Sequence, residues 1–503
     1  MASTSELLDW DTLRWGLSAF CLAVAHPGPL SWAAPFLAVI GLLLFLQWEL
    51  DRPRSGFSIW LWGSLVATGQ LGWMASPQYV GIWCLFAVPM LASVIGLQWW
   101  ITLRIWKRTR QPLLFATCWA LMEWSRTFWF SGLLFGTWST CLTDYPFLMM
   151  LANLGGHWTI TWWLCAWAAS WAKHGWRSPI MLALGALPIL YGLLWRLSSL
   201  IGEQVRPTKQ VSLIQTGHWP DRRHDDPSTC LEEIYDQLQR IPTSSDLIVL
   251  PESAVVFGLD TVLQEIPRIT LRDFYSHLAV TRGSDLIIGA DQSTSRGWTT
   301  GALWASPKGT TEYYAKQLLI TGAEEVPGEW ALPFLKPFGI QSSWQRGPSP
   351  ALWRVSGWNI APGICYEECH AGLCRTLHAQ RADLLLFLNN DGWYDTSSLT
   401  YHHAAHGQLR AVELGCPVLQ VGHTGITGGW DRHGVSLGSL PLYETGILSL
   451  EVRPATYTTP WSKWGYGTWS LFGIVTVLGW LSQRRAGRAS LDPARRLEQI
   501  PSG

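Results

Sequence analysis

The feature that most limits how this chain folds is a series of long apolar runs in its first 200 residues, with one more near its C-terminus. A helix needs roughly 20 apolar residues to cross the hydrocarbon core of a bilayer. By that criterion we expect about eight spans. They cover residues 13–25, 32–48, 59–74, 82–100, 113–130, 148–171, 178–197 and 464–481. The chain is therefore predicted to have a multi-pass α-helical membrane domain over residues 1–200 and a C-terminal transmembrane helix over 464–481.

Residues 204–450 lie between these apolar regions and have the composition of an ordinary water-soluble domain. The chain as a whole is 48% hydrophobic and only 14% charged, as expected for a membrane protein that carries one such domain. Its formal net charge is zero, which gives no reason to expect a nucleic-acid partner.

Lysine and arginine follow the even-numbered spans, and the loops after spans one, three and five contain neither. These residues are Arg52, Arg54, Arg104, Lys107, Arg108, Arg110, Lys173, Arg177, Arg484, Arg485, Arg488, Arg495 and Arg496. Basic residues near the ends of spans stay on the cytoplasmic side. We therefore expect both termini, including a basic tail at 482–503, to be cytoplasmic. Residues 204–450 would then lie in the periplasm of a bacterial cell with this protein in its inner membrane.

Within residues 204–450, short β-rich runs alternate with helix-compatible stretches, a pattern that indicates an α/β layered domain. The run 384–388 is Leu-Leu-Leu-Phe-Leu, apolar on both faces, which is typical of a strand in a sheet covered on both sides. It leads into the polar turn Asn389-Asn-Asp-Gly-Trp393, where a site can form.

Three β-like runs each end in a residue able to take part in acyl transfer: Glu252, Lys316 and Cys365. Cys365 is the candidate nucleophile, because a thiolate is strongly nucleophilic and its thioester still reacts with an amine. Glu252 is the candidate base, with burial expected to raise its pKa into a useful range. Lys316 is the candidate group that stabilises the tetrahedral oxyanion.

Each of these residues also has an ordinary interpretation. Glu252 alone fits a charge at a helix N-terminus, and Lys316 alone fits a surface side chain. A zinc site is a rival for the thiol, because four soft ligands fall within ten positions. These are Cys365, Cys369, His370 and Cys374. Their spacing is not a standard zinc pattern, so we expect neither a metal nor a cofactor.

A second group of histidines, His402, His403 and His406, also allows a metal site. We interpret it instead as the exposed start of a helix.

The ordered motifs resemble the carbon–nitrogen hydrolase (nitrilase) superfamily. They are Leu250-Pro-Glu252, Tyr314-Ala-Lys316, Ile364-Cys-Tyr-Glu367, Asn389-Asn-Asp-Gly-Trp393 and Gln408-Leu-Arg-Ala-Val-Glu-Leu-Gly415. Together with the membrane half, they resemble the apolipoprotein N-acyltransferase family along nearly the whole chain. The loop 320–327 departs from the family pattern, with Thr321 and Gly322 in place of a proline and an aromatic residue, and 424–427 lacks an expected asparagine.

The resemblance implies an αββα sandwich for residues 204–450, and it assigns to Glu252, Lys316 and Cys365 the same three roles. It also implies that an acyl chain moves from a membrane phospholipid, through a thioester, to the N-terminal amine of a diacylglyceryl-cysteine lipoprotein precursor. We expect a monomer. The alternatives are a membrane-tethered amidase and a non-catalytic membrane protein that keeps the hydrolase fold.

Further residues are expected to support the site. Glu324 and Glu367 are acidic neighbours able to orient Lys316 and keep it charged, with Tyr366 beside them, although Glu324 also fits a solvated loop. The loop 322–330 is a candidate lid that brings Val326 and Trp330 to the lipid, or else a plain surface loop.

Two charges fall inside an apolar run. Glu123 and Arg126 are three residues apart, so they share a helix face and can pair within the membrane. The pair is either structural or a contact for a phospholipid head group.

Overall fold

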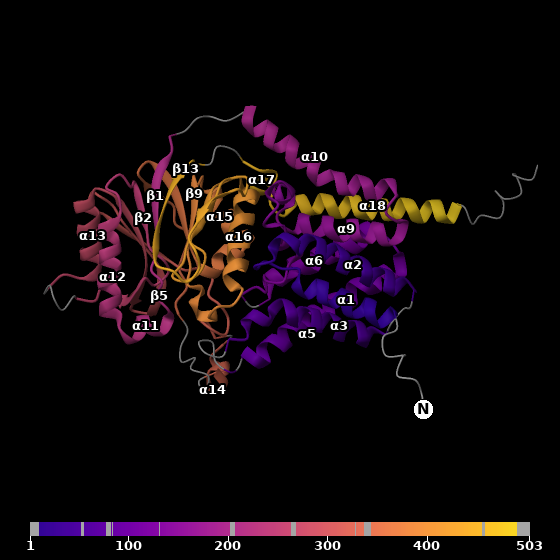
Figure 1. Ribbon diagram of the computed structural model, residues 1–503, viewed down its shortest axis with the longest axis horizontal. Helices are drawn as coiled ribbons and strands as arrows, with labels where there is room; N and C mark the ends of the chain where they lie inside the picture. The colour runs from indigo at the N-terminus through magenta and orange to yellow at the C-terminus, as the bar shows by residue number, and fades with distance from the viewer. Residues whose placement is uncertain are drawn as a thin grey trace, which may run out of the picture.

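The computed structural model describes residues 10–51, 55–76, 82, 84–129, 131–201, 207–262, 268–326, 328–335, 344–454 and 458–489. A bundle of helices and a two-sheet domain lie side by side, and the chain enters the sheets from α10 and returns to the bundle through α18 (Figure 1). The predicted combination of a helical membrane domain with a nitrilase-like α/β domain is confirmed. Most of the expected basic tail, from residue 490 onward, lies outside the described residues.

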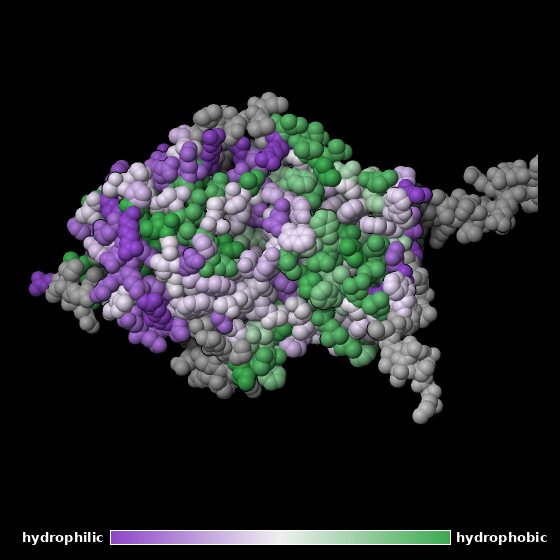
Figure 2. All heavy atoms as spheres, in the orientation of Figure 1, coloured by the Kyte–Doolittle hydropathy of each residue, from purple (hydrophilic) through white to green (hydrophobic). Residues whose placement is uncertain are grey.

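The bundle is built from the apolar runs of the sequence. Its helices are α1 (Trp10–Val24), α2 (Ala34–Asp51), α3 (Gly56–Leu71), α5 (Cys84–Thr109), α6 (Pro112–Ser125), α7 (Pro146–Met149), α8 (Ala152–Gly155), α9 (Trp158–His174), α10 (Pro179–Ile201) and α18 (Gly467–Ala489). Among the described residues, three helical segments are long and apolar enough to cross a membrane: Ser31–Glu49, Cys84–Thr109 and Pro179–Leu197. Hydrophobic residues dominate the surface of this half of the molecule, whereas hydrophilic residues gather over the sheets and at the far end of the bundle (Figure 2).

Two of the expected spans differ from the helices observed. The run 148–171 was expected to be one helix, but Gly156 has a φ of 78° and separates the short helices α7 and α8 from α9. The run 113–130 forms α6 only as far as Ser125, and a 3-10 turn, Arg126–Phe128, follows. The chain turns there because the charged pair in this segment binds the backbone of the loop that comes next.

The two sheets of the α/β domain pack face to face. The first has the strand order β13-β1-β2-β4-β5-β6, with β3 paired to β4, and the second has the order β12-β11-β10-β9-β8-β7. The strands are β1 (Lys209–Gln215), β2 (Leu247–Val249), β3 (Val255–Gly258), β4 (Asp285–Thr294), β5 (Gly297–Ala305), β6 (Thr311–Ala315), β7 (Trp353–Val355), β8 (Trp358–Ile364), β9 (Leu384–Leu388), β10 (Val418–Val421), β11 (Gly428–Trp430), β12 (Ser436–Ser439) and β13 (Gly446–Val452).

Helices cover the outer face of each sheet. They are α11 (Pro220–Asp225), α12 (Pro227–Arg240), α13 (Leu271–Arg282), α15 (Ala371–Ala379), α16 (Leu399–Leu414) and α17 (Pro460–Trp464). The short helix α14 (Leu332–Leu335) lies apart from both sheets, at the bottom of the view in Figure 1. The central strand β9 is fully buried, as its sequence predicted: Leu386 packs between the sheets, and Leu385 and Phe387 pack beneath the helical layer on the other face. Because side chains alternate along a strand, β9 contributes both to the core between the two sheets and to the core beneath the helices.

Helix α16 lies between the second sheet and the bundle (Figure 1). Its histidines were expected at an exposed helix start, and that expectation is wrong: His402, His403 and His406 are at most 2% exposed. The loops of the bundle cover them, with the Phe135 ring about 6 Å from each imidazole. A helix that looks amphipathic in sequence is buried all round because a second domain packs on its polar face.

Charged residues fix this junction. On α16, the guanidinium of Arg410 donates to the Glu413 carboxylate at 3.0 Å, and both side chains are fully buried. The same carboxylate accepts a hydrogen bond from the backbone N–H of His157, at the start of α9, at 2.5 Å. Breaking a buried charged cluster by removing one partner is costly, so the two domains are expected to hold one relative position.

Candidate active site

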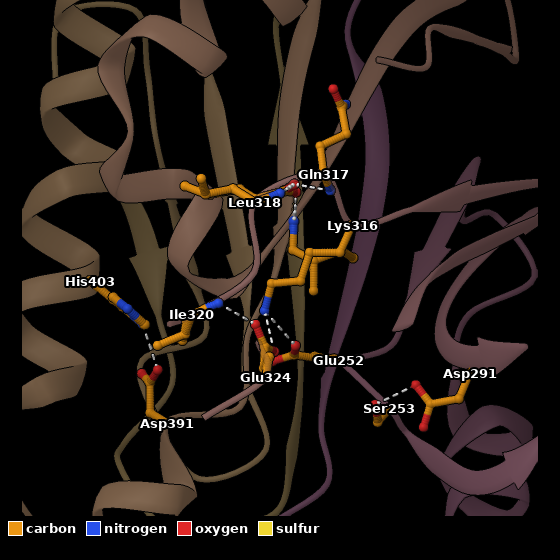
Figure 3. Close-up of polar contacts among 12 residues, drawn as sticks. Glu252, Ser253, Asp291, Lys316, Gln317, Leu318, Ile320, Glu324, Asp391 and His403 are labelled. Atoms are coloured by element: carbon orange, nitrogen blue, oxygen red, sulfur yellow. Dashed lines mark hydrogen bonds and ion pairs between the residues drawn. The ribbon is translucent and has the colours of Figure 1, made fainter. Parts of the chain in front are cut away.

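Glu252, Lys316 and Cys365 meet at one edge of the sandwich although they come from different parts of the chain. Glu252 follows β2, Lys316 follows β6 and Cys365 follows β8. Strands β2 and β6 belong to the first sheet and β8 to the second, so the site lies between the two sheets. Figure 3 shows the Lys316 ammonium directed at the carboxylates of Glu252 and Glu324.

Lys316 is fully buried and its ammonium contacts two carboxylates. Its Nζ lies 2.7 Å from Glu324 Oε1 and 3.4 Å from Glu252 Oε1. Burial acts to lower the pKa of this ammonium, but the two carboxylates outweigh it, and the pKa is well above its ordinary value. The site therefore holds a permanent positive charge, placed to attract a developing oxyanion.

The backbone around Glu252 passes very close to the neighbouring strand. A Cβ on Gly289 of β4 would lie 2.1 Å from the carbonyl oxygen of Pro251, so only glycine fits at that position. The carbonyl of Glu252 accepts a hydrogen bond from His423 Nε2 at 2.7 Å. Burial raises the pKa of the Glu252 carboxyl, while Lys316 opposes that rise. A carboxyl with a raised pKa is better suited to exchange protons near neutral pH.

Cys365 lies at a sharp turn at the end of β8, where the backbone has a φ of 50°. That left-handed conformation is unfavourable for a residue with a Cβ, and it brings the chain abruptly from the strand into the 3-10 helix Cys365–Cys369. The Glu252 carboxylate is a close neighbour of this thiol and acts on its pKa. Burial and Glu252 raise the pKa of the thiol, and Lys316 opposes them. The resting group is a thiol with a base beside it to take its proton.

Glu367 has a role that the sequence did not indicate. Its Oε1 accepts from the backbone N–H groups of Gln317 and Leu318 at 2.6 and 3.1 Å. Its Oε2 accepts from the N–H of Ile364 at 2.8 Å and from the Tyr314 hydroxyl at 2.9 Å. This buried carboxylate does not contact the Lys316 ammonium. It clamps the backbone on both sides of the site and so sets the position of Lys316 relative to Cys365.

Glu324 belongs to the loop after Lys316 and fixes that loop to the site. One oxygen accepts from Lys316, and the other accepts from the N–H of Ile320 at 2.9 Å. The next residue, Thr321, donates its N–H to the hydroxyl of Ser131 in the bundle at 3.0 Å. Of the candidate lid residues, Trp330 is 72% exposed and Val326 is partly buried. Pro327, between them, lies outside the described residues.

Tyr366 connects the nucleophile to the membrane half. Its hydroxyl donates to the carbonyl of Gly132 at 2.6 Å and accepts from the N–H of Leu134 at 3.4 Å. The bundle loop that it binds also contains Ser131, which holds the candidate lid loop. One loop of the membrane half thus contacts both the residue after the candidate nucleophile and the loop after the candidate oxyanion-binding lysine.

Arg223 is a site residue that sequence reasoning missed. It is 2% exposed and donates to the carbonyl of Ser253, the residue after Glu252, at 2.6 Å. Burial lowers the pKa of its guanidinium to about 10, while Glu252 and Asp291 act against that shift. It belongs to α11, a short polar helix whose sequence carries no motif, so only the tertiary fold brings it to the site.

A second missed group surrounds the turn 389–391, which the sequence marked only as a place where a site can form. Glu368 is fully buried and accepts from the Asn389 amide at 2.9 Å, and burial raises the pKa of its carboxyl to about 8. Next to it, His403 Nδ1 lies 2.7 Å from Asp391 Oδ1. Of this group, Asp391 acts on Cys365 and helps to raise the pKa of its thiol.

The zinc alternative does not fit the geometry. Among the described residues, no three histidine, cysteine or carboxylate side chains are grouped so as to hold a metal ion. Cys369 and Cys374 are fully buried, and the Cys374 thiol donates to the carbonyl of Glu367 at 3.3 Å. Cys374 therefore behaves as a small buried apolar side chain with weak hydrogen bonds to the backbone.

The charged pair in the bundle is also inside the protein. Arg126 NH2 lies 3.8 Å from Glu123 Oε1, and both residues are at most 2% exposed. Glu123 accepts from the Thr161 hydroxyl at 2.8 Å, and Arg126 donates to the carbonyls of Phe135 and Gly136 at 3.4 Å. These contacts hold in place the loop that binds Tyr366, which favours the structural interpretation of the pair.

Comparisons with known proteins show what this chain is similar to. The carbon–nitrogen hydrolase family model matches residues 212–459, and that of the apolipoprotein N-acyltransferase N-terminal domain matches residues 18–170. An apolipoprotein N-acyltransferase of Azotobacter vinelandii is 31% identical over 95% of this chain and 98% of the relative. One of Chlamydia trachomatis is 26% identical over 94% and 96%. A solved carbon–nitrogen hydrolase superfamily protein of Xanthomonas campestris is 20% identical, with a TM-score of 0.39 over 49% of this chain and 91% of that one. Since the match to the first relative spans nearly the whole of both chains, this chain belongs to the apolipoprotein N-acyltransferase family.

Proposed function

We propose that this protein transfers a fatty acyl chain from a membrane phospholipid to the N-terminal amine of a diacylglyceryl-cysteine lipoprotein precursor. One observation carries the proposal. The buried ammonium of Lys316, the carboxyl of Glu252 and the thiol of Cys365 meet at one edge of the sandwich, and the loops at this edge are hydrogen bonded to the membrane half. A site in that place serves substrates that are anchored in the bilayer.

The reaction has two halves. Glu252 takes the proton of the Cys365 thiol, and the thiolate attacks the ester carbonyl of the phospholipid while Lys316 stabilises the oxyanion. The tetrahedral intermediate expels a lysophospholipid alkoxide, which takes the proton back from Glu252 and leaves a thioester on Cys365. The amine of the acceptor then attacks the thioester and gives a proton to Glu252. Collapse forms the amide and releases the thiolate, which is protonated again.

The same framework explains why the sandwich is joined so firmly to the bundle. A membrane-tethered amidase would need only an anchor. Here Tyr366 and Thr321 are hydrogen bonded to bundle residues, and Glu413 is buried against His157. This junction supports a reaction in which the membrane half takes part in presenting the substrate.

The first prediction concerns the nucleophile. Incubation of the purified protein with phospholipid alone should add one fatty-acyl mass to the peptide that contains Cys365, detected by mass spectrometry. Cys365→Ala should abolish both this adduct and acyl transfer. Cys369→Ala and Cys374→Ala serve as matched controls and should keep substantial activity, because both thiols are buried in packing positions. Transfer that survives in Cys365→Ala would rule out the thioester route.

The second prediction concerns Glu252 and Lys316. Each of Glu252→Gln and Lys316→Met should slow acylation by about 10² to 10⁴-fold, the usual range for one acid–base or oxyanion group. Glu325→Gln is a suitable control, because this carboxylate is in the same loop as Glu324 but pairs with Arg346. Single-turnover acylation rates and thermal unfolding of each variant separate a chemical defect from a folding defect. A near-normal rate in either site variant would remove that residue from the mechanism.

We further propose that the protein lies in the bacterial inner membrane with about eight spans, α1, α2, α3, α5, α6, α9, α10 and α18. Both termini are then cytoplasmic and the sandwich is periplasmic. The support is the distribution of lysine and arginine along the sequence, together with the apolar surface of the bundle (Figure 2).

The third prediction tests this topology. At Pro207, only a reporter that works in the periplasm should be active. At Arg488, only a reporter that works in the cytoplasm should be active. Alkaline phosphatase and green fluorescent protein, which work in opposite compartments, make a matched pair at each position. A cytoplasmic signal at Pro207 would overturn both the orientation and the lipoprotein assignment.

We also propose that the loop 322–330 acts as a lid that contacts lipid. Trp330 is the most exposed tryptophan among the described residues, and the loop contains Glu324, which binds Lys316.

The fourth prediction follows from this position. Trp330→Ala should lower kcat/KM for phospholipid in vesicles more than for short water-soluble esters, since only the first substrate must be drawn from a bilayer. Trp298→Ala, at an exposed tryptophan of β5, is the control. An equal loss with both substrates would assign Trp330 a plain structural role.

A further inference from the structure

A groove of about 520 Å³ lies between α3 and α5, outside the site already described. Its lining combines aromatic, aliphatic and basic side chains: Gly56, Phe57, Ile59, Trp60, Leu97, Trp100, Arg104 and Lys107. No acidic side chain is among these lining residues. A groove of this size and composition matches the head group and upper acyl region of one lipid.

The groove is at the end of the bundle that faces away from the sandwich. Trp73, just after the C-terminal end of α3, contacts the rings of Tyr394 and His402 in the sandwich. The groove includes Gly56, at the N-terminal end of the same helix. At 1.5 Å per residue the two ends of α3 are about 22 Å apart. A lipid in this groove therefore belongs to the leaflet opposite the sandwich, and it is not the acyl donor at Cys365.

Helices α3 and α5 pack tightly next to the groove and separate where the groove begins. A Cβ on Gly96 would lie 2.6 Å from the carbonyl of Trp60, so the two helices almost touch at that point. One turn nearer the end, a Cβ at position 56 would lie 2.3 Å from Nε1 of Trp100. Glycine at position 56 thus leaves room for the Trp100 indole as a wall of the groove. On the other side, Trp60 is fixed by a hydrogen bond from Nε1 to the carbonyl of Ser93 at 3.0 Å.

The charges of the groove favour an anion. Arg104 is exposed, and its guanidinium lies 4.8 Å from the centre of the Trp100 ring, which holds the cation over the groove. Lys107 lies 2.6 Å from the buried carboxylate of Glu49, which anchors its side chain and offsets its charge. The N-terminus of α3 adds the positive end of a helix dipole. Among the described residues that line the groove, Arg104 is therefore the main positive group for a ligand.

We propose that this groove is a specific site for an anionic phospholipid of the leaflet opposite the sandwich. The phosphate binds Arg104, with Lys107 beside it, and the upper acyl chain lies along Phe57 and Leu97. Basic residues near the ends of spans also attract anionic lipids in a general way. A general attraction would depend equally on any exposed arginine of this region, whereas a built groove depends on Arg104.

The test is native mass spectrometry of the full-length protein in detergent, titrated with phosphatidylglycerol or with phosphatidylcholine of the same acyl chains. Arg104→Gln should weaken the first phosphatidylglycerol adduct by about tenfold, as expected for the loss of one charge-assisted contact. Arg104→Lys should retain part of the affinity. Arg108→Gln is the matched control, because Arg108 is exposed one turn farther along α5 and does not line the groove.

Stronger binding of phosphatidylglycerol than of phosphatidylcholine, lost in Arg104→Gln and kept in Arg108→Gln, supports the site. Equal losses in the two variants, or equal binding of the two lipids, would overturn it in favour of general attraction. A dimer mass that disappears in Arg104→Gln would overturn it in favour of a second copy of the chain as the occupant. None of these outcomes depends on acyl transfer, so the proposed function and this site are tested separately.

Discussion

Burying the Lys316 ammonium is the constraint around which the active site is built. A charge removed from water costs several kcal/mol unless opposite charges and hydrogen bonds surround it. Glu252 and Glu324 provide those charges at 3.4 and 2.7 Å, and each belongs to a different segment of the chain. The same arrangement then has a chemical consequence, because one of the two carboxylates, that of Glu252, also neighbours the Cys365 thiol and raises its pKa. The carboxylate that helps to neutralise Lys316 is therefore the same one that we propose as the base for the thiol.

The membrane half completes this arrangement. Tyr366 and Thr321 flank the site and are bonded to neighbouring residues of a single bundle loop. That loop is held in turn by Arg126, which donates to the carbonyls of Phe135 and Gly136. From the sequence this buried charge pair was either structural or a contact for a phospholipid head group, and its contacts favour the structural interpretation: it positions the bundle loop that the candidate site residues contact. The Tyr366 hydroxyl makes two hydrogen bonds to this loop. Because Tyr366 directly follows Cys365, a displacement of the loop would also shift Cys365.

Position, more than residue type, decided where sequence reasoning succeeded. Glu252, Lys316 and Cys365 each follow an apolar β-like run, so their local pattern already placed them at strand ends. Glu367 was expected to orient the Lys316 ammonium, but it binds backbone N–H groups on both sides of the site. Arg223 lies in a polar helix without any motif, and its contact with Ser253 exists only in the folded chain. The buried histidines of α16 were misassigned because their cover comes from another domain.

The sequence by itself determined the two-part organisation and the layered α/β class, and it singled out the three candidate reactive side chains. Apolar run length, strand alternation and the ordered motifs are local properties, and each can be read from neighbouring residues. Tertiary structure decided which carboxylate contacts Lys316, where the helical runs 113–130 and 148–171 break, and which polar side chains are buried. Those outcomes depend on desolvation by segments far away in the chain. The free-energy cost of burying a polar group depends on whether a partner hydrogen bonds to it. That partner comes from a distant segment, so the local sequence does not predict it.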